Sequence, residues 1–158
     1  MKNTIQPNLA LFQKMSSLPM GRQLFSKGVC IKAPYFNSIK PLMTDLRPGK
    51  AEVQVKKHRA IQNHLGTVHA IAMCNMAELA GGMMTDVSIP TTHRWIPKGM
   101  KVEYLSKATS DLTAVATGTL PDVWPDADEF TANVDIKDRQ GVSVARMEIA
   151  MWVSVKKK

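Results

Sequence analysis

Glu78 is the residue whose surroundings in the sequence first suggest chemistry. Between Arg59 and Asp86 it is the only side chain that carries a formal charge. An ionised carboxylate in an apolar interior costs several kcal/mol unless it is paired or hydrogen-bonded. No cation stands three or four residues from Glu78, where a helix would bring it within reach. The carboxylate therefore either bonds backbone or water at the edge of the core, or faces a cleft and acts there as a base or a nucleophile.

The helix that carries this acid is apolar on nearly every side. Segment 63–87 is predicted to be a loop followed by the helix, with Gly66 as the break and the Thr67 hydroxyl as the cap. One face repeats at a spacing of three and four residues: Val68, Ile71, Ala72, Met76, Leu79, Ala80, Met83 and Val87. The opposite face is scarcely more polar: Ala70, Met73, Cys74, Ala77 and Gly81. A helix of this kind is enclosed by the rest of the fold, so we expect it at the centre of the molecule.

The flanking segments predict the elements that must enclose this helix. Residues 1–30 form an N-terminal helical segment, with one or two short helices within 8–27, and 31–34 is a connector. Strands 37–47 and 50–58 follow. After the central helix the apolar period changes from 3.6 to 2, which predicts four more strands, around 100–104, 112–117, 130–136 and 145–155. Short turns between these strands favour antiparallel pairing. We therefore expect one α+β domain over residues 1–158, with a curved six-stranded antiparallel sheet wrapped around the helix.

The order of these motifs is similar to that of a known superfamily. The chain resembles hotdog-fold proteins, and its central stretch resembles the phenylacetyl-CoA thioesterase-like branch. In that branch an Asn, a Gly and a His-Gly-Gly motif precede a helix that carries an acid. The matching residues here are Asn63, Gly66, the triplet His-Ala-Ile at 69–71, and Glu78, and segment 102–118 is similar to the strand-turn-strand that follows. The resemblance implies a hotdog fold, an acyl-CoA or acyl-carrier thioester as substrate, and a homodimer or dimer of dimers.

The resemblance also implies roles for two groups on the helix. The backbone amide of Ala70 would polarise the thioester carbonyl, and Glu78 would attack the carbonyl or activate water. Eight residues of helix span about 12 Å, so the two groups of one chain cannot flank one carbonyl. If two copies set their helices antiparallel across a twofold axis, Glu78 of one copy faces Ala70 of the other. The expected activity is thioester hydrolysis at a dimer interface, with no cofactor beyond the coenzyme A of the substrate.

Three further residues of this stretch have parallels in the superfamily. Asn63 either orients the water or the carbonyl, or bonds nearby loop backbone. His69 is given a structural or capping role. His64 with Glu78 resembles the loop His and helix Glu that act across the dimer in acyl-carrier dehydratases of this fold. The Phe-Pro-Gly continuation of those enzymes is absent here, so a dehydratase is the less favoured alternative.

Two departures from the thioesterase pattern favour a different alternative, a protein that binds acyl-CoA without cleaving it. Ala70 and Ile71 replace the paired glycines, which crowds the backbone beside the carbonyl. Gly82 stands where some hotdog thioesterases have a hydroxyl residue, one turn beyond the acid. Gly81 and Gly82 either open room for an acyl chain or a facing helix, or allow close helix packing.

Composition limits the remaining classes of function. The net charge of +8 suits a ligand that carries phosphate groups. Arg94, Lys98 and Lys101 are the predicted contacts for CoA phosphates, with Lys107 and Arg146 as weaker candidates. The basic residues are scattered, and the sequence contains no recognised nucleic-acid motif and no metal-ligand motif.

The cysteines and the apolar runs indicate where the protein works. Cys30 and Cys74 lie in apolar stretches, which predicts buried thiols and a reducing compartment. Residues 1–10 lack the unbroken apolar run of a signal peptide, and no segment is apolar enough to span a membrane. We expect a cytoplasmic protein with no metal and no nucleic-acid partner.

Overall fold

Alternating apolar residues build an antiparallel sheet. The computed structural model describes residues 5–157, and six strands lie within them: β1 (Leu42–Arg47), β2 (Lys50–Val55), β3 (His93–Tyr104), β4 (Leu112–Thr117), β5 (Ala127–Lys137) and β6 (Ser143–Val155). Their order is β1-β2-β4-β5-β6-β3, and every neighbouring pair is antiparallel. Along the inner strands alternate residues are buried, among them Ala114, Val134 and Met147. One face of the sheet is therefore a wall of the core.

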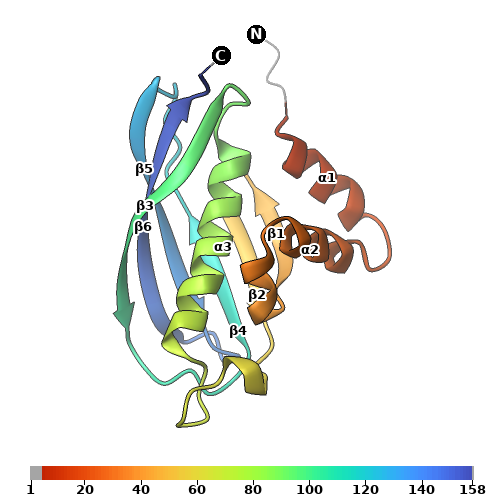
Figure 1. Ribbon diagram of the computed structural model, residues 1–158, viewed down its shortest axis with the longest axis vertical. Coiled ribbons are helices and arrows are strands. Elements are labelled where there is room, and N and C mark those ends of the chain that lie inside the picture. Colours follow the sequence, from red (N-terminus) through yellow and green to blue (C-terminus); the bar gives the residue numbers. More distant parts are fainter. Residues whose placement is uncertain (1–4, 158) are drawn as a thin grey trace.

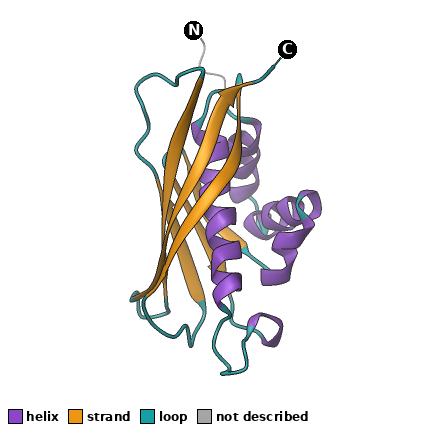
Figure 2. Cartoon of the chain, turned by 60° about the vertical axis from the view of Figure 1, so that its left-hand side comes forward, coloured by secondary structure: helices purple, strands orange, loops and turns teal. Residues whose placement is uncertain are grey.

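The central helix α3 (Ala70–Ser88) runs across that face (Figures 1 and 2). Met76, Ala80 and Met84 are at most 1% exposed and form its side toward the sheet. Gly81 allows a close approach, since a Cβ atom there would lie 3.1 Å from Ile149 Cδ1. The predicted hotdog architecture, a curved six-stranded antiparallel sheet around a long central helix, is confirmed.

Two short helices lie beside α3 and β1 on the side away from β3, α1 (Pro7–Ser16) and α2 (Gly21–Lys32) (Figure 1). The hydroxyl of Ser26 accepts a hydrogen bond of 2.8 Å from the amide of Met43, which docks α2 onto β1. The predicted short N-terminal helices are confirmed, and residues 1–4 of the predicted segment 1–30 lie outside the described residues. Among the helices of residues 5–157, none is long and apolar enough to cross a membrane.

Several predicted boundaries are wrong. α2 continues to Lys32 through the predicted connector, and a 3₁₀ helix η1 (Pro34–Ile39) stands where the first strand was expected to begin. A second 3₁₀ helix η2 (Arg59–Ile61) interrupts the loop before α3. β3 begins at His93 rather than near residue 100. Its first half was missed because Pro97 and a shift of register before Gly99 break the alternation, as an edge strand can tolerate.

Candidate active site

The side chain of Glu78 lies at a pocket. The pocket has a volume of about 320 Å³ and is formed by α2, η1, α3 and β3. The other lining residues are Val29, Lys32, Ala33, Phe36, Leu79, Gly82, Met83, Asp86 and Trp95. Glu78 is half-buried and forms no ion pair with any of residues 5–157. A carboxylate without a cation partner, at the wall of a mainly apolar pocket, is placed where it can meet a ligand.

The start of α3 presents a free amide. His69 is the N-cap residue, and its Nδ1 accepts a hydrogen bond of 3.1 Å from the amide of Ile71. His69 thus has the capping role that the sequence analysis gave it, whereas the prediction that Thr67 caps the helix is wrong. The amide of Ala70 makes no hydrogen bond to any residue in the described part of the chain. As a helix-start N–H without an internal acceptor, it can stabilise negative charge on a ligand.

Asn63 organises the loop that leads into the helix. Its Oδ1 accepts hydrogen bonds from the amides of Leu65 (3.0 Å) and Thr67 (3.2 Å), and its Nδ2 donates to the Thr67 hydroxyl (2.9 Å). Of the two roles considered for Asn63, orienting the reacting groups or bonding the loop backbone, these contacts correspond to the second. His64 is exposed in the same loop, and neither Asn63 nor His64 lines the Glu78 pocket. One copy of the chain therefore does not bring them to the carboxylate.

A second hollow, of about 230 Å³, lies at the start of α3. Its lining residues are Tyr35, Ser38, Ile39, Ala60, Ile61, Gln62, His69, Ile71, Ala72 and Asn75. Asn75 is only 5% exposed; its Nδ2 donates to the Ser38 hydroxyl at 3.0 Å, and its Oδ1 is buried without a hydrogen-bond partner among residues 5–157. Asn75 stands about one turn before Glu78. The two hollows therefore follow one another along α3, against the α2–η1 segment.

One turn before Glu78, α3 is tied to the end of β3. The sulfur of Cys74 lies 3.3 Å from the hydroxyl of Tyr104, and that hydroxyl lies 3.5 Å from the carbonyl oxygen of Ala70. The hydrogen bond with Cys74, assisted by burial, raises the pKa of Tyr104 to about 12. Cys30 is buried as predicted, but Cys74 is only half-buried, so that part of the prediction is wrong. Both cysteines are free thiols.

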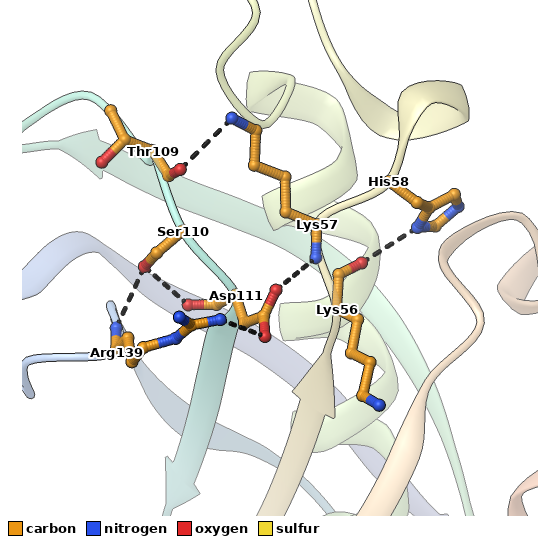
Figure 3. Close-up of polar contacts among 7 residues, drawn as sticks. All are labelled: Lys56, Lys57, His58, Thr109, Ser110, Asp111 and Arg139. Atoms are coloured by element: carbon orange, nitrogen blue, oxygen red, sulfur yellow. Dashed lines mark hydrogen bonds and ion pairs between the residues drawn. The ribbon is translucent and has the colours of Figure 1, made fainter.

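A polar network holds the loops around the start of α3 (Figure 3). Asp111 accepts hydrogen bonds from the amide of Lys57 (2.8 Å) and from the guanidinium of Arg139 (2.9 Å). These two contacts lower the pKa of the Asp111 carboxyl. In the same β3–β4 loop, the carbonyl oxygen of Ala108 accepts a hydrogen bond of 2.8 Å from the amide of Val68. Three loops and the beginning of α3 are thus fixed to one another.

The three cations predicted for CoA phosphates all lie on β3. Lys98 pairs with Glu129 at 3.2 Å and lies over the ring of Trp152, and Lys101 pairs with Glu148 at 3.6 Å. Arg94 is exposed on the same strand. None of the three lines either hollow along α3, so the assignment of phosphate contacts stays a prediction.

Trp95 and Asp86 are pocket residues that sequence reasoning missed. The indole of Trp95 covers Gly82, where a Cβ atom would lie 2.7 Å from its Cη2. Gly82 thus packs closely against Trp95 and also lines the pocket, and its predicted role in substrate binding stays a prediction. Asp86 stands eight residues after Glu78, a spacing that could have placed it on the same helical face. Trp95 was hidden because the first half of β3 was not predicted.

Both the sequence and the fold of this chain are similar to those of known proteins. A family model described as "Domain of unknown function (DUF4442)" matches residues 21–153. The structural-genomics protein APC5556 is 47% identical, with a TM-score of 0.83, over 94% of this chain and 99% of that protein. A thioesterase family protein from Silicibacter pomeroyi is 16% identical, with a TM-score of 0.72, over 87% of this chain and 100% of that protein. Thioesterase HI1161 from Haemophilus influenzae is 13% identical, with a TM-score of 0.68, over 77% of this chain and 82% of that protein. Among curated proteins, none matches this sequence.

Proposed function

The chain belongs to the DUF4442 family, and we propose that it is a thioesterase that hydrolyses an acyl-CoA or acyl-carrier thioester at a site shared by two copies. The observation that carries the proposal is the half-buried carboxylate of Glu78 at a pocket with mainly apolar walls. The thioesterases from Silicibacter pomeroyi and Haemophilus influenzae support it through their shared fold.

Thioester hydrolysis needs a group that delivers oxygen to the carbonyl carbon and a donor for the oxyanion. Glu78 either attacks the carbon itself or takes a proton from the water that attacks. The tetrahedral oxyanion then accepts a hydrogen bond from the free amide of Ala70, aided by the field of the helix start. Collapse of this intermediate breaks the carbon–sulfur bond and releases the thiol. When Glu78 is the nucleophile, water then hydrolyses the acyl-enzyme anhydride.

Two copies are required because these groups are far apart in one chain. Ala70 and Glu78 are separated by about 12 Å of helix. β3 is an edge of the sheet, twelve residues long, and it leaves Ile96 (60%) and Tyr104 (49%) exposed. A long exposed edge strand is a template for pairing with another chain. Antiparallel pairing of two β3 strands across a twofold axis would set the two α3 helices side by side in opposite directions.

A protein that binds acyl thioesters without cleaving them is the second candidate. Ile71 favours it, because this side chain is 55% exposed at the place where the related thioesterases have a glycine. Such a bulky residue beside the free amide narrows the space for a thioester carbonyl. Calorimetric binding of acyl-CoAs without release of thiol would identify this function.

The test of hydrolysis compares two matched Glu→Gln variants. Release of CoA thiol is measured with short, aromatic and long acyl-CoAs. We expect Glu78→Gln to lower kcat by about 10²- to 10⁴-fold, the usual contribution of an acid–base group. Glu52→Gln is the control, because Glu52 lies on β2 and its Oε1 accepts a hydrogen bond from Thr44 that glutamine can also accept. Equal rates for Glu78→Gln and the parent protein would contradict the proposal.

A further inference from the structure

Trp95 forms a wall of the Glu78 pocket and is held there by two contacts. Its indole lies against Gly82, where even a methyl group would collide with it, since a Cβ atom would lie 2.7 Å from Cη2. Its Nε1–H donates a hydrogen bond of 3.2 Å to Oδ1 of Asp86. The absence of a side chain at position 82 thus leaves the space that the indole occupies, and Asp86 fixes the orientation of the indole.

Asp86 is itself fixed from the N-terminal helix. Its other oxygen, Oδ2, accepts a hydrogen bond of 2.7 Å from Nδ2 of Asn8 on α1. Both carboxylate oxygens of Asp86 are therefore engaged, one by α1 and one by β3. A carboxylate held on both sides restricts the rotamers of the indole that it binds. Asn8, Asp86 and Trp95 form a latch that joins α1, α3 and β3.

The position of this latch along the helix relates it to the carboxylate. Glu78, Gly82 and Asp86 follow one another at intervals of about one turn, and all three line the same pocket. A group bound at Glu78 and extending along the helix toward its C-terminal end therefore meets the indole of Trp95. The pocket volume of about 320 Å³ is at the lower end of the range for ligand pockets.

We infer that Trp95 sets the length of the acyl group that the protein accepts, and that the latch of Asn8 and Asp86 keeps this limit short. This inference rests on the proposed function, because it places the thioester carbonyl at Glu78 and the acyl group in the pocket beside it. The substrate class is a thioester of a short or compact apolar acyl group. Trp95 and Asp86 are specificity-determining and positioning residues, respectively.

The test measures binding, so that it does not depend on hydrolysis. The probes are S-alkyl-CoA thioethers from ethyl to dodecyl, which lack the carbonyl group and are not cleaved, and their Kd values are determined by calorimetry. In the parent protein we expect affinity to fall between butyl and octyl. In Trp95→Ala the ratio of the octyl Kd to the butyl Kd should fall by about 10-fold or more, the scale on which apolar pockets discriminate chain length.

Two further variants keep the test decisive. Asp86→Ala leaves the indole in place but frees it, so we expect a smaller shift in the same direction, even where Trp95→Ala folds poorly. Trp152→Ala removes an indole from β6, outside the pocket, and should leave the ratio unchanged. The inference is overturned if the ratio stays within about twofold of the parent in Trp95→Ala and Asp86→Ala alike, or if no thioether binds. If the variants change the Kd ratio as expected but the parent protein does not hydrolyse acyl-CoAs, the inference stands and only the proposed activity is contradicted.

Discussion

At the scale of single residues, the amide of Ala70 can be removed without disturbing the helix that it begins. Ala70 is the first residue of α3, a position at which proline is favoured because its missing N–H has no intrahelical acceptor. His69 has φ −63° and ψ 139°, an extended conformation that a following proline tolerates. We predict that Ala70→Pro folds normally and lowers kcat about 10²- to 10³-fold, as loss of an oxyanion donor does.

Thiol release and circular dichroism check this prediction together. The matched control is Ala70→Gly, which keeps the amide and should keep most of the activity. If Ala70→Pro has the helical spectrum of the parent and cleaves thioesters equally fast, the oxyanion is stabilised by another donor.

Glu78 and His69 show how far single residues could be predicted from the sequence. The isolation of Glu78 in an apolar stretch predicted a carboxylate that either bonds at the edge of the core or faces a cleft, and the structure shows it at a pocket with no ion pair to any of residues 5–157. The helix cap was assigned to Thr67, but the hydroxyl of Thr67 is engaged by Asn63 and the cap is His69. Which of two neighbouring polar residues caps a helix depends on loop contacts that no local pattern records.

At the scale of elements, the Asp111 network fixes the loops that present the start of α3. The hydrogen bond from the Lys57 amide lowers the pKa of Asp111 most, and the hydrogen bond from Arg139 lowers it further. The network therefore stabilises the fold at pH values above the ordinary aspartate pKa of about 3.9. This contribution is lost as the pH falls through the lowered value. Because the Asp111 side chain is 39% exposed, we expect Asp111→Ala to cost about 1 kcal/mol or less at neutral pH.

Thermal unfolding at pH 7 and pH 3 measures this effect. The difference in Tm between Asp111→Ala and the parent should narrow at pH 3, because below the ordinary aspartate pKa the unfolded parent binds a proton at Asp111 more readily than the folded parent does. Asp122→Ala, in the exposed β4–β5 loop, serves as the control and should change Tm little at either pH. A Tm difference that widens toward pH 3 would show that the carboxylate does not hold these loops.

Elements with a regular period were predicted well, and those without one were not. Buried alternation gave β4, β5 and β6 close to their observed bounds, since one-sided burial repeats along a strand. The first half of β3 has no such repeat, because it is an edge strand with Pro97 and a shift of register before Gly99. Because that segment was not predicted as a strand, Trp95 was not recognised as a residue of the pocket wall.

At the scale of the whole molecule, the proposed function places the site where two copies meet. The free amide of Ala70 and the carboxylate of Glu78 lie about 12 Å apart on one helix, and the exposed edge of β3 offers a surface on which a second copy can pair. The sequence analysis predicted this arrangement from two sources, the roles that the resemblance to hotdog thioesterases implies for Ala70 and Glu78 and the length of helix between them. The phosphate contacts stay a prediction, and the sequence could not show that Lys98 pairs with Glu129 on β5 and Lys101 with Glu148 on β6, because these carboxylates are distant in sequence.

The most direct test of this account is the activity of a mixed dimer. One chain carries Glu78→Gln, the other carries Ala70→Pro, and two different affinity tags allow the dimer with one of each to be isolated. One of its two sites then has both an intact carboxylate and an intact amide, so we predict about half of the parent activity from two chains that are each inactive alone. A mixed dimer no more active than either variant by itself would contradict a site shared between copies.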